Sequence, residues 1–86
     1  MQIPSDPMER LIAEALQDAG EPYLHEVPTG NRAIDFYLPN RDIYIEVKRF
    51  HSDRLDAQMS VCENIIAVQG KPAVQMLARL LRSMNR

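Results

Sequence analysis

The stretch Ala33-Ile-Asp-Phe-Tyr-Leu-Pro-Asn-Arg-Asp-Ile-Tyr-Ile-Glu-Val-Lys48 decides the fold of this chain. Apolar and polar residues alternate in both of its arms, which predicts two β-strands that each turn one face toward a core. Between the arms, the sequence Pro-Asn-Arg-Asp at 39–42 is typical of a four-residue hairpin loop. The expected core residues are Ile34, Phe36, Leu38, Ile43, Ile45 and Val47.

The other face of this hairpin carries charged residues. In the register that the loop sets, Phe36 faces Ile45 and Asp35 lies directly opposite Glu46. Like charges in directly opposite positions destabilise a sheet by up to roughly 1 kcal/mol. A cation should therefore compensate them. Lys48, two residues beyond Glu46 on the same face, is one candidate, and a divalent ion is another.

Asp35 and Glu46 are candidate ligands of Mg²⁺ or Mn²⁺, because these ions prefer hard oxygen ligands and keep several waters. A water retained by the metal can become a nucleophile. Lys48 could orient that water or neutralise a phosphate. The alternative is a solvated polar face, because an Asp followed by Glu-x-Lys also occurs by chance in charged proteins.

The N-terminal part predicts a helix followed by a strand. Asp6 is the expected N-cap, Pro7 the first helical residue and Glu9 the capping-box residue, and Gly20 follows the end of the helix. Residues 23–27 then form the first expected strand.

The part after Lys48 predicts a helix, a strand and a second helix. The short helix begins at Ser52 or Asp53. The apolar run at 65–68 predicts a strand that is buried on both faces and parallel to the second arm of the hairpin. A last helix starts at 70–72. The expected order over a single domain, 1–86, is α-β-β-β-α-β-α.

Asp35 on one strand and Glu46-x-Lys48 on the next resemble the PD-(D/E)XK nuclease superfamily, whose members have a restriction-endonuclease-like fold. The element order matches the αβββαβ core of that α/β fold, a mixed four-stranded sheet flanked by helices, with one C-terminal helix added. Ile34 replaces the usual proline before the first acid. The pattern of Glu46-x-Lys48, then Gln58 on a helix, then an apolar strand looks most like the small, phage-like replication-repair nucleases of the virus type. Those enzymes carry a tyrosine one turn after the glutamine, where this chain has Cys62. The segments Ser5-x-x-x-Glu9-x-Leu11 and Ile34-Asp-Phe-Tyr-Leu38 also look like those of very-short-patch-repair enzymes.

The resemblance implies a metal-dependent DNA endonuclease that hydrolyses phosphodiester bonds. Asp35 and Glu46 would bind Mg²⁺ or Mn²⁺, and the backbone carbonyl of Val47 would add a ligand. Lys48 would position the attacking water or stabilise charge on the phosphate. Gln58 would reach Lys48 or a metal-bound water; the alternative is a polar residue at the border of the helix's apolar stripe.

A glutamate of the first helix often lies near the metal in this superfamily, which makes Glu9 the candidate for completing the metal shell. Capping alone is the other explanation of Glu9, and Glu14 lies farther round the helix. His25 is expected to be structural. A zinc site from His25, His51 and Cys62 lacks ligand-like spacing.

The composition limits the partners and the compartment. A formal net charge of −2 argues against a generally basic nucleic-acid coat protein but allows a local basic rim. Cys62 is the only cysteine, which favours a reducing compartment. No stretch approaches the roughly 20 apolar residues of a membrane span. A cytoplasmic protein, phage- or prophage-encoded, is expected.

The small size of the chain favours self-association. A single-module DNA interface already buries roughly 600 to 1,000 Å². A homodimer through the last helix would widen the footprint and suit branched DNA such as a Holliday junction, which small members of the family cut. Two alternatives are a non-catalytic nuclease-fold module that binds DNA or protein, and a structural or inhibitory phage-type protein.

Overall fold

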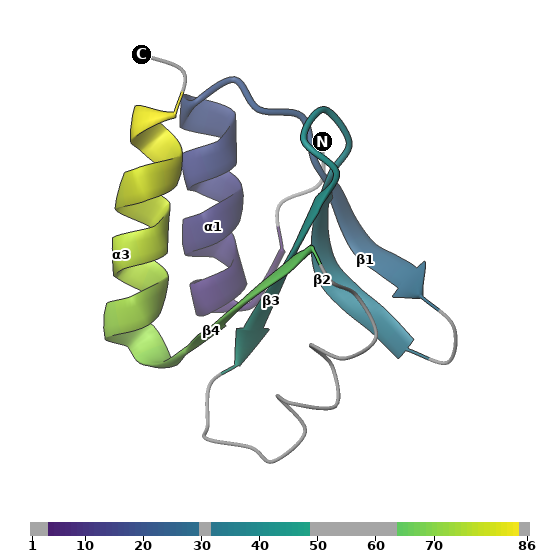
Figure 1. Cartoon of the computed structure of the whole chain (residues 1–86). Coiled ribbons are helices and arrows are strands. Elements are labelled where there is room, and N and C mark those ends of the chain that lie inside the picture. The colour runs from purple at the N-terminus through teal and green to yellow at the C-terminus, as the bar shows by residue number, and fades with distance from the viewer. Residues whose placement is uncertain (1–3, 30–31, 49–63, 85–86) are drawn as a thin grey trace.

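The structure, a computed structural model, describes residues 4–29, 32–48 and 64–84. In these residues, two helices pack on one face of a mixed four-stranded sheet (Figure 1). The elements are α1 (Pro7–Asp18), β1 (Leu24–Thr29), β2 (Arg32–Leu38), β3 (Ile43–Lys48), β4 (Ile65–Gln69) and α3 (Gly70–Ser83). The α/β class is as predicted. The helix expected after Ser52 lies outside the described residues, and so does Gln58.

Both ends of α1 follow from local signals. The side chain of Asp6 accepts hydrogen bonds from the backbone N–H groups of Met8 and Glu9, so it is the predicted N-cap. The helix ends at Asp18, and Gly20 adopts a left-handed φ of 70°, which a residue without a Cβ reaches at no steric cost. The predicted start and stop are confirmed.

The strands follow the order β1-β2-β3-β4, with antiparallel pairs β1–β2 and β2–β3 and a parallel pair β3–β4. Phe36 pairs with Ile45, which confirms the predicted register. The parallel orientation of β4 is also confirmed, but its predicted burial on both faces is wrong. Ile66 is 40% exposed, because β4 lies at the edge of the described sheet.

The strands β2 and β3 pair only near their connecting loop. Their ladder covers residues 36–38 and 43–45, while β2 begins at Arg32 and β3 continues to Lys48. Beyond Phe36 and Ile45, β2 pairs only with β1 and β3 only with β4. Figure 1 shows the two strand pairs separating away from the loop. We call this point of separation the strand fork.

The core lies between the sheet and the two helices. On the sheet side it contains Phe36, Leu38 and Ile45, all completely or almost completely buried. The helices α1 and α3 run side by side in the same direction (Figure 1), and Arg82 Nε donates to Asp18 Oδ2 at 2.9 Å near their ends. Neither helix of the described part has the length and apolarity needed to cross a membrane.

Candidate functional site

Asp35 marks the strand fork. Its Oδ2 accepts a hydrogen bond from the backbone N–H of Val47 at 2.8 Å. At this point β3 has left the β2 ladder, so the carboxylate takes the place of a backbone acceptor. Asp35 is thereby held beside β3, with its second oxygen remaining as an acceptor. The fork brings Asp35 next to Glu46, as the sequence predicted.

Glu46 is buried, although it lies on the face that the sequence marks as polar. The residue is 3% exposed. Its carboxyl hydrogen-bonds to that of Asp35, and its Oε1 lies 3.7 Å from Lys48 Nζ. The structure therefore brings together the three residues of the predicted motif. A merely solvated polar face does not describe Glu46.

Burial is the largest cause that raises the pKa of Glu46 from its ordinary value of 4.5 to about 8. The hydrogen bond to Asp35 and the charge of Asp35 act in the same direction, while the ammonium of Lys48 acts against them. With its pKa raised in this way, the Glu46 carboxyl keeps its proton at neutral pH, which prevents two adjacent negative charges.

A divalent cation can take the place of this proton. Two carboxyl groups that cannot both ionise alone become good ligands when a positive ion lies between them, and hard oxygen donors suit Mg²⁺ or Mn²⁺. The N–H and C=O of a strand residue point toward the same neighbouring strand. Since the N–H of Val47 points to Asp35, its carbonyl should also face the fork. These donors are hard oxygens, the ligand type that Mg²⁺ and Mn²⁺ prefer.

The side chain of Glu9 contacts a residue of the sheet, so capping of α1 is not its only interaction. Its Oε1 lies 2.8 Å from His25 Nε2, and the ring of His25 packs against Phe36 with the centroids 5.3 Å apart. The charge of Glu9 also contributes, least of the causes, to the raised pKa of Glu46. The structure therefore places Glu9 within electrostatic reach of the pair, while Glu14 is exposed.

The described residues contain no group of three or more His, Cys, Asp or Glu side chains that is already arranged to hold a metal. Two carboxyl groups, Asp35 and Glu46, are in direct contact, and Glu9 is engaged by His25. A site with so few protein ligands suits an ion that keeps most of its own water, as Mg²⁺ does.

Sequence reasoning missed Gln69. This residue ends β4 and is the register partner of Lys48 on β3. The two side chains lie next to each other at the carboxyl ends of parallel strands, where ligands of α/β sheets commonly bind. The sequence feature that could have indicated this residue is its position, because Gln69 is the first polar residue after the apolar run at 65–68.

Two tyrosines lie beside the carboxyl pair. Tyr37 pairs with Tyr44 across the strands, and the ring centroids are 4.6 Å apart. Tyr37 also donates to Asp42 Oδ1 at 2.9 Å. This hydrogen bond is the main reason that the pKa of Tyr37 is raised. The two rings therefore form an aromatic cross-strand pair.

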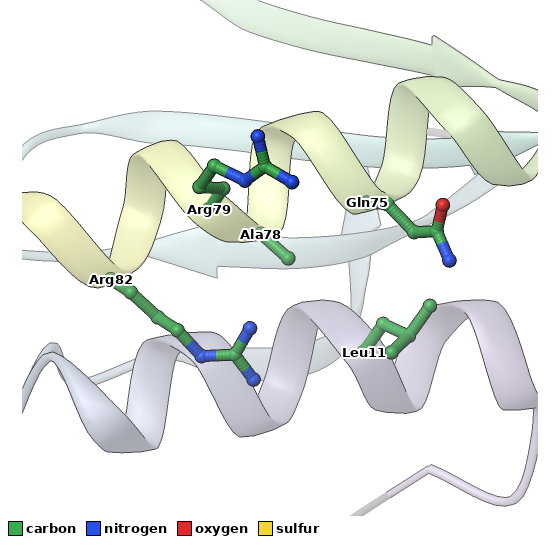
Figure 2. Close-up of a pocket in the computed structure, with 5 residues that line it drawn as sticks. All are labelled: Leu11, Gln75, Ala78, Arg79 and Arg82. Atoms are coloured by element: carbon green, nitrogen blue, oxygen red, sulfur yellow. The ribbon is translucent and has the colours of Figure 1, made fainter.

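A separate hollow of about 390 Å³ lies between the helices (Figure 2). It is lined by Leu11, Gln75, Ala78, Arg79 and Arg82. Figure 2 shows Arg82 reaching from α3 toward α1, where its partner is Asp18. The lining includes none of the residues at the fork, so this hollow is not part of the carboxylate site.

Comparison with known proteins gives no assignment, because no family model, curated protein or solved structure matches this chain.

Proposed function

We propose that this chain is a Mg²⁺- or Mn²⁺-dependent DNA endonuclease of the PD-(D/E)XK type. The observation that carries the proposal is the buried contact between the Asp35 and Glu46 carboxyl groups, with Lys48 Nζ 3.7 Å from Glu46. Burial of a carboxyl group such as that of Glu46 costs free energy unless hydrogen bonds or a counter-charge compensate it. Strongly perturbed carboxyl groups are typical of functional sites.

The reaction is hydrolysis of a phosphodiester bond. Water attacks phosphorus, one P–O bond to a sugar breaks, and the leaving oxygen takes up a proton. When bound, the metal ion would supply a water of lowered pKa and neutralise charge on the phosphate. Asp35, Glu46 and the carbonyl of Val47 would hold the ion.

The remaining roles belong to groups that the fold positions. Val47 N–H keeps the Asp35 carboxylate oriented, which lowers the reorganisation needed when a ligand arrives. Glu46 must release its proton when it becomes a ligand. Lys48 has its ammonium beside this carboxyl, and is suited to stabilise the negative charge that develops on the phosphate.

Branched DNA and a homodimer are part of the proposal. Met76 and Leu80 on α3 are 66% and 60% exposed, and they lie four residues apart on one side of the helix. A second copy packing there would bury them and present two strand forks to one substrate. The core-facing residues of α3 pack within the chain itself.

A non-catalytic binding module is the second candidate. The observation that favours it is the hydrogen bond between the Glu46 and Asp35 carboxyl groups, because a protonated Glu46 can donate to Asp35 without a metal between them. In this case the fork would be a recognition surface, and cleavage would not occur under any metal condition.

Cleavage of labelled DNA by purified protein tests the proposal. Linear duplex, single-stranded, flap and four-way-junction DNA are each incubated with Mg²⁺, Mn²⁺ or EDTA. The informative variant is Glu46→Gln, because an amide keeps the shape and the hydrogen bond of a protonated carboxyl but is a poor ligand. Glu14→Gln is the matched control, since Glu14 is exposed on α1.

We expect metal-dependent cutting by the wild type and by Glu14→Gln, and none by Glu46→Gln. DNA binding without cutting by the wild type would support the recognition module. Equal cutting by wild type and Glu46→Gln would exclude the fork as the active site.

A further inference from the structure

We infer that Tyr37 and Tyr44 form a stacking platform for an unpaired base of the DNA substrate, beside the Asp35–Glu46 pair. The inference rests on the proposed endonuclease function and narrows its substrate class to DNA with an unpaired base next to the cleaved phosphate. The observation that carries it is the contact between two partly exposed rings, whose centroids are 4.6 Å apart with 38° between the planes.

The two tyrosines and the two carboxyl groups lie on the same face of the sheet. Phe36 and Ile45 are register partners and are completely buried on the face that packs against α1 and α3. Side chains alternate along a strand, so the residues on either side of Phe36 and Ile45 project from the opposite face. These residues are the tyrosine pair, Tyr37 and Tyr44, and the carboxyl pair, Asp35 and Glu46.

The spacing between the two pairs suits one nucleotide. Each tyrosine is two residues from a carboxyl group of its own strand, which corresponds to about 7 Å along the strand. A base that lies on the rings therefore has a neighbouring phosphate close to the strand fork. Lys48 Nζ, 3.7 Å from Glu46 Oε1, supplies the complementary positive charge for that phosphate.

Hydrogen bonds at the hairpin loop form the platform before DNA arrives. Tyr37 donates to Asp42 Oδ1 at 2.9 Å, and Asp42 adopts a left-handed φ of 53° in the loop. The backbone carbonyl of Asp42 accepts a hydrogen bond from the side chain of Asn64, and the Asn64 carbonyl accepts from the Tyr44 N–H at 2.9 Å. A surface that is already ordered loses less entropy on binding.

The platform is the centre of an apolar row that crosses the described sheet. Leu24 of β1 is the register partner of Tyr37, and Ile65 of β4 is the register partner of Tyr44. Leu24 is 54% exposed, so the row presents apolar surface to the solvent. Aromatic side chains bind bases through their flat faces, and in a continuous duplex those faces are covered by the neighbouring base pairs. The row therefore favours an unpaired base.

Binding of labelled DNA without cleavage tests the inference. Fluorescence anisotropy in EDTA measures the dissociation constants for three DNAs: a duplex, the same duplex with a single-stranded flap, and that flap with abasic residues in place of its bases. The proteins are wild type, Tyr37→Leu, Tyr44→Leu and Tyr44→Phe. Circular dichroism establishes that each variant is folded at the temperature used.

We expect the wild type to bind the flap at least about fivefold more tightly than the abasic flap, because stacking on an aromatic side chain contributes this much or more per base. Tyr37→Leu and Tyr44→Leu should each weaken binding to the flap by a similar factor and bind the abasic flap as the wild type does. Tyr44→Phe keeps the ring and should bind all three DNAs as the wild type does.

Tyr23→Leu is the matched control, because it makes the same change at the third tyrosine of the chain. Tyr23 is 5% exposed, and its ring packs edge-on against Phe36 with the centroids 5.6 Å apart. Its replacement should lower the free energy of unfolding and leave the affinity for each DNA unchanged.

Two results would overturn the inference alone. One is unchanged affinity for the flap in a folded Tyr44→Leu, and the other is an equal loss for the flap and the abasic flap, since a purely structural role does not depend on the bases. Metal-dependent cutting that Glu46→Gln abolishes would then leave the proposed function standing.

The remaining outcomes concern other occupants of the row. Loss of self-association in Tyr44→Leu, measured by sedimentation equilibrium with unchanged DNA affinity, would assign the row to a second copy of the chain and overturn the inference. A wild type that neither binds nor cuts any of these DNAs would overturn the inference and the proposed function together.

Discussion

Asp35 Oδ2 accepts a hydrogen bond from the backbone N–H of Val47 at 2.8 Å. The ladder between β2 and β3 ends at Phe36 and Ile45, so the side chain of Asp35 replaces a backbone carbonyl as the acceptor for Val47. This single contact joins the fold to the candidate chemistry. It holds the carboxylate next to Glu46, and it satisfies a polar group at the place where two strands separate. Changes at Asp35 should consequently affect both stability and function, and the two effects can be separated.

Asp35→Ala removes the acceptor of the Val47 N–H, and we expect it to lower the free energy of unfolding by about 1 to 3 kcal/mol. Asp35→Asn keeps an amide oxygen as acceptor, so its loss of stability should be smaller. Both should abolish metal-dependent cleavage, because neither provides a carboxylate. Urea unfolding and the cleavage assay check the two effects separately. Full activity in Asp35→Asn would contradict the assigned role.

Stability should fall as the pH rises from about 4.5 to about 8. The pKa of Glu46 is raised to about 8 in the folded chain from its ordinary value of 4.5. Between these values the folded state holds a proton that the unfolded state has released. Each pH unit in that window therefore costs up to about 1.4 kcal/mol, the value for one proton. Above pH 8 this contribution becomes constant.

Glu46→Gln is the control for this pH dependence. The glutamine side chain does not titrate, so the free energy of unfolding of this variant should fall less steeply with pH than that of the wild type, by the contribution of one proton. Saturating Mg²⁺ should have a related effect on the wild type, because an ion that binds only the folded chain stabilises it. Chemical unfolding at a series of pH values measures both. An unchanged decline in Glu46→Gln would show that another group causes it.

Glu26→Gly should stabilise the chain. Glu26 has a φ of 57° inside β1, between His25 and Val27, which pair with Phe36 and Ile34. The left-handed region costs a residue with a Cβ roughly 1 to 2 kcal/mol, and glycine avoids that cost. We expect a gain of about 0.5 to 1 kcal/mol after the larger entropy of the unfolded glycine is counted. Thermal unfolding measures this.

The comparison for Glu26 is Glu14→Gly. Glu14 is exposed in the interior of α1, where glycine should cost about 1 kcal/mol. The two substitutions remove the same charged side chain and should act in opposite directions. A loss of stability in both would show that Glu26 does not hold the left-handed conformation at a cost.

Arg41→Met should destabilise the chain without affecting cleavage. Glu21 is 4% exposed, and its Oε1 accepts from Arg41 Nε at 2.9 Å. Losing one partner of a buried polar contact costs about 1 to 3 kcal/mol. The residue lies in the hairpin loop, at the end of the sheet opposite to the fork. Reduced metal affinity in a fully folded Arg41→Met would show that the loop is coupled to the site.

Met76→Ser and Leu80→Ser should weaken self-association. Both side chains are largely exposed on α3, so their loss should change the free energy of unfolding of the monomer by less than about 0.5 kcal/mol. Sedimentation equilibrium of the wild type and of the variant that carries both Met76→Ser and Leu80→Ser measures the dissociation constant of the dimer. A monomeric wild type over the accessible concentration range would remove the homodimer from the proposal.

Local signals in the sequence determined most of the elements. The alternation around Phe36 and Ile45 predicted two strands and their core face, and the loop at 39–42 predicted their register, because period and loop length act over a few residues. Asp6 and Gly20 marked the ends of α1 for the same reason. These features depend only on neighbours along the chain.

The candidate site was predicted in part. The opposition of Asp35 and Glu46 follows from the hairpin register, and so does the position of Lys48 on their face. The burial of Glu46 does not follow, because it depends on what surrounds the sheet. The edge position that leaves Ile66 exposed depends likewise on the order of the strands.

Only the tertiary structure decided where the strands separate and which distant residues meet there. His25 and Glu9 are 16 positions apart, and Gln69 reaches Lys48 through a parallel crossover. The sequence by itself determined the hairpin, its register and its acidic face, since short-range periodicity and turn chemistry specify them. The strand fork, the burial of Glu46 and the His25–Glu9 contact depend on packing between separate elements, which no local pattern encodes.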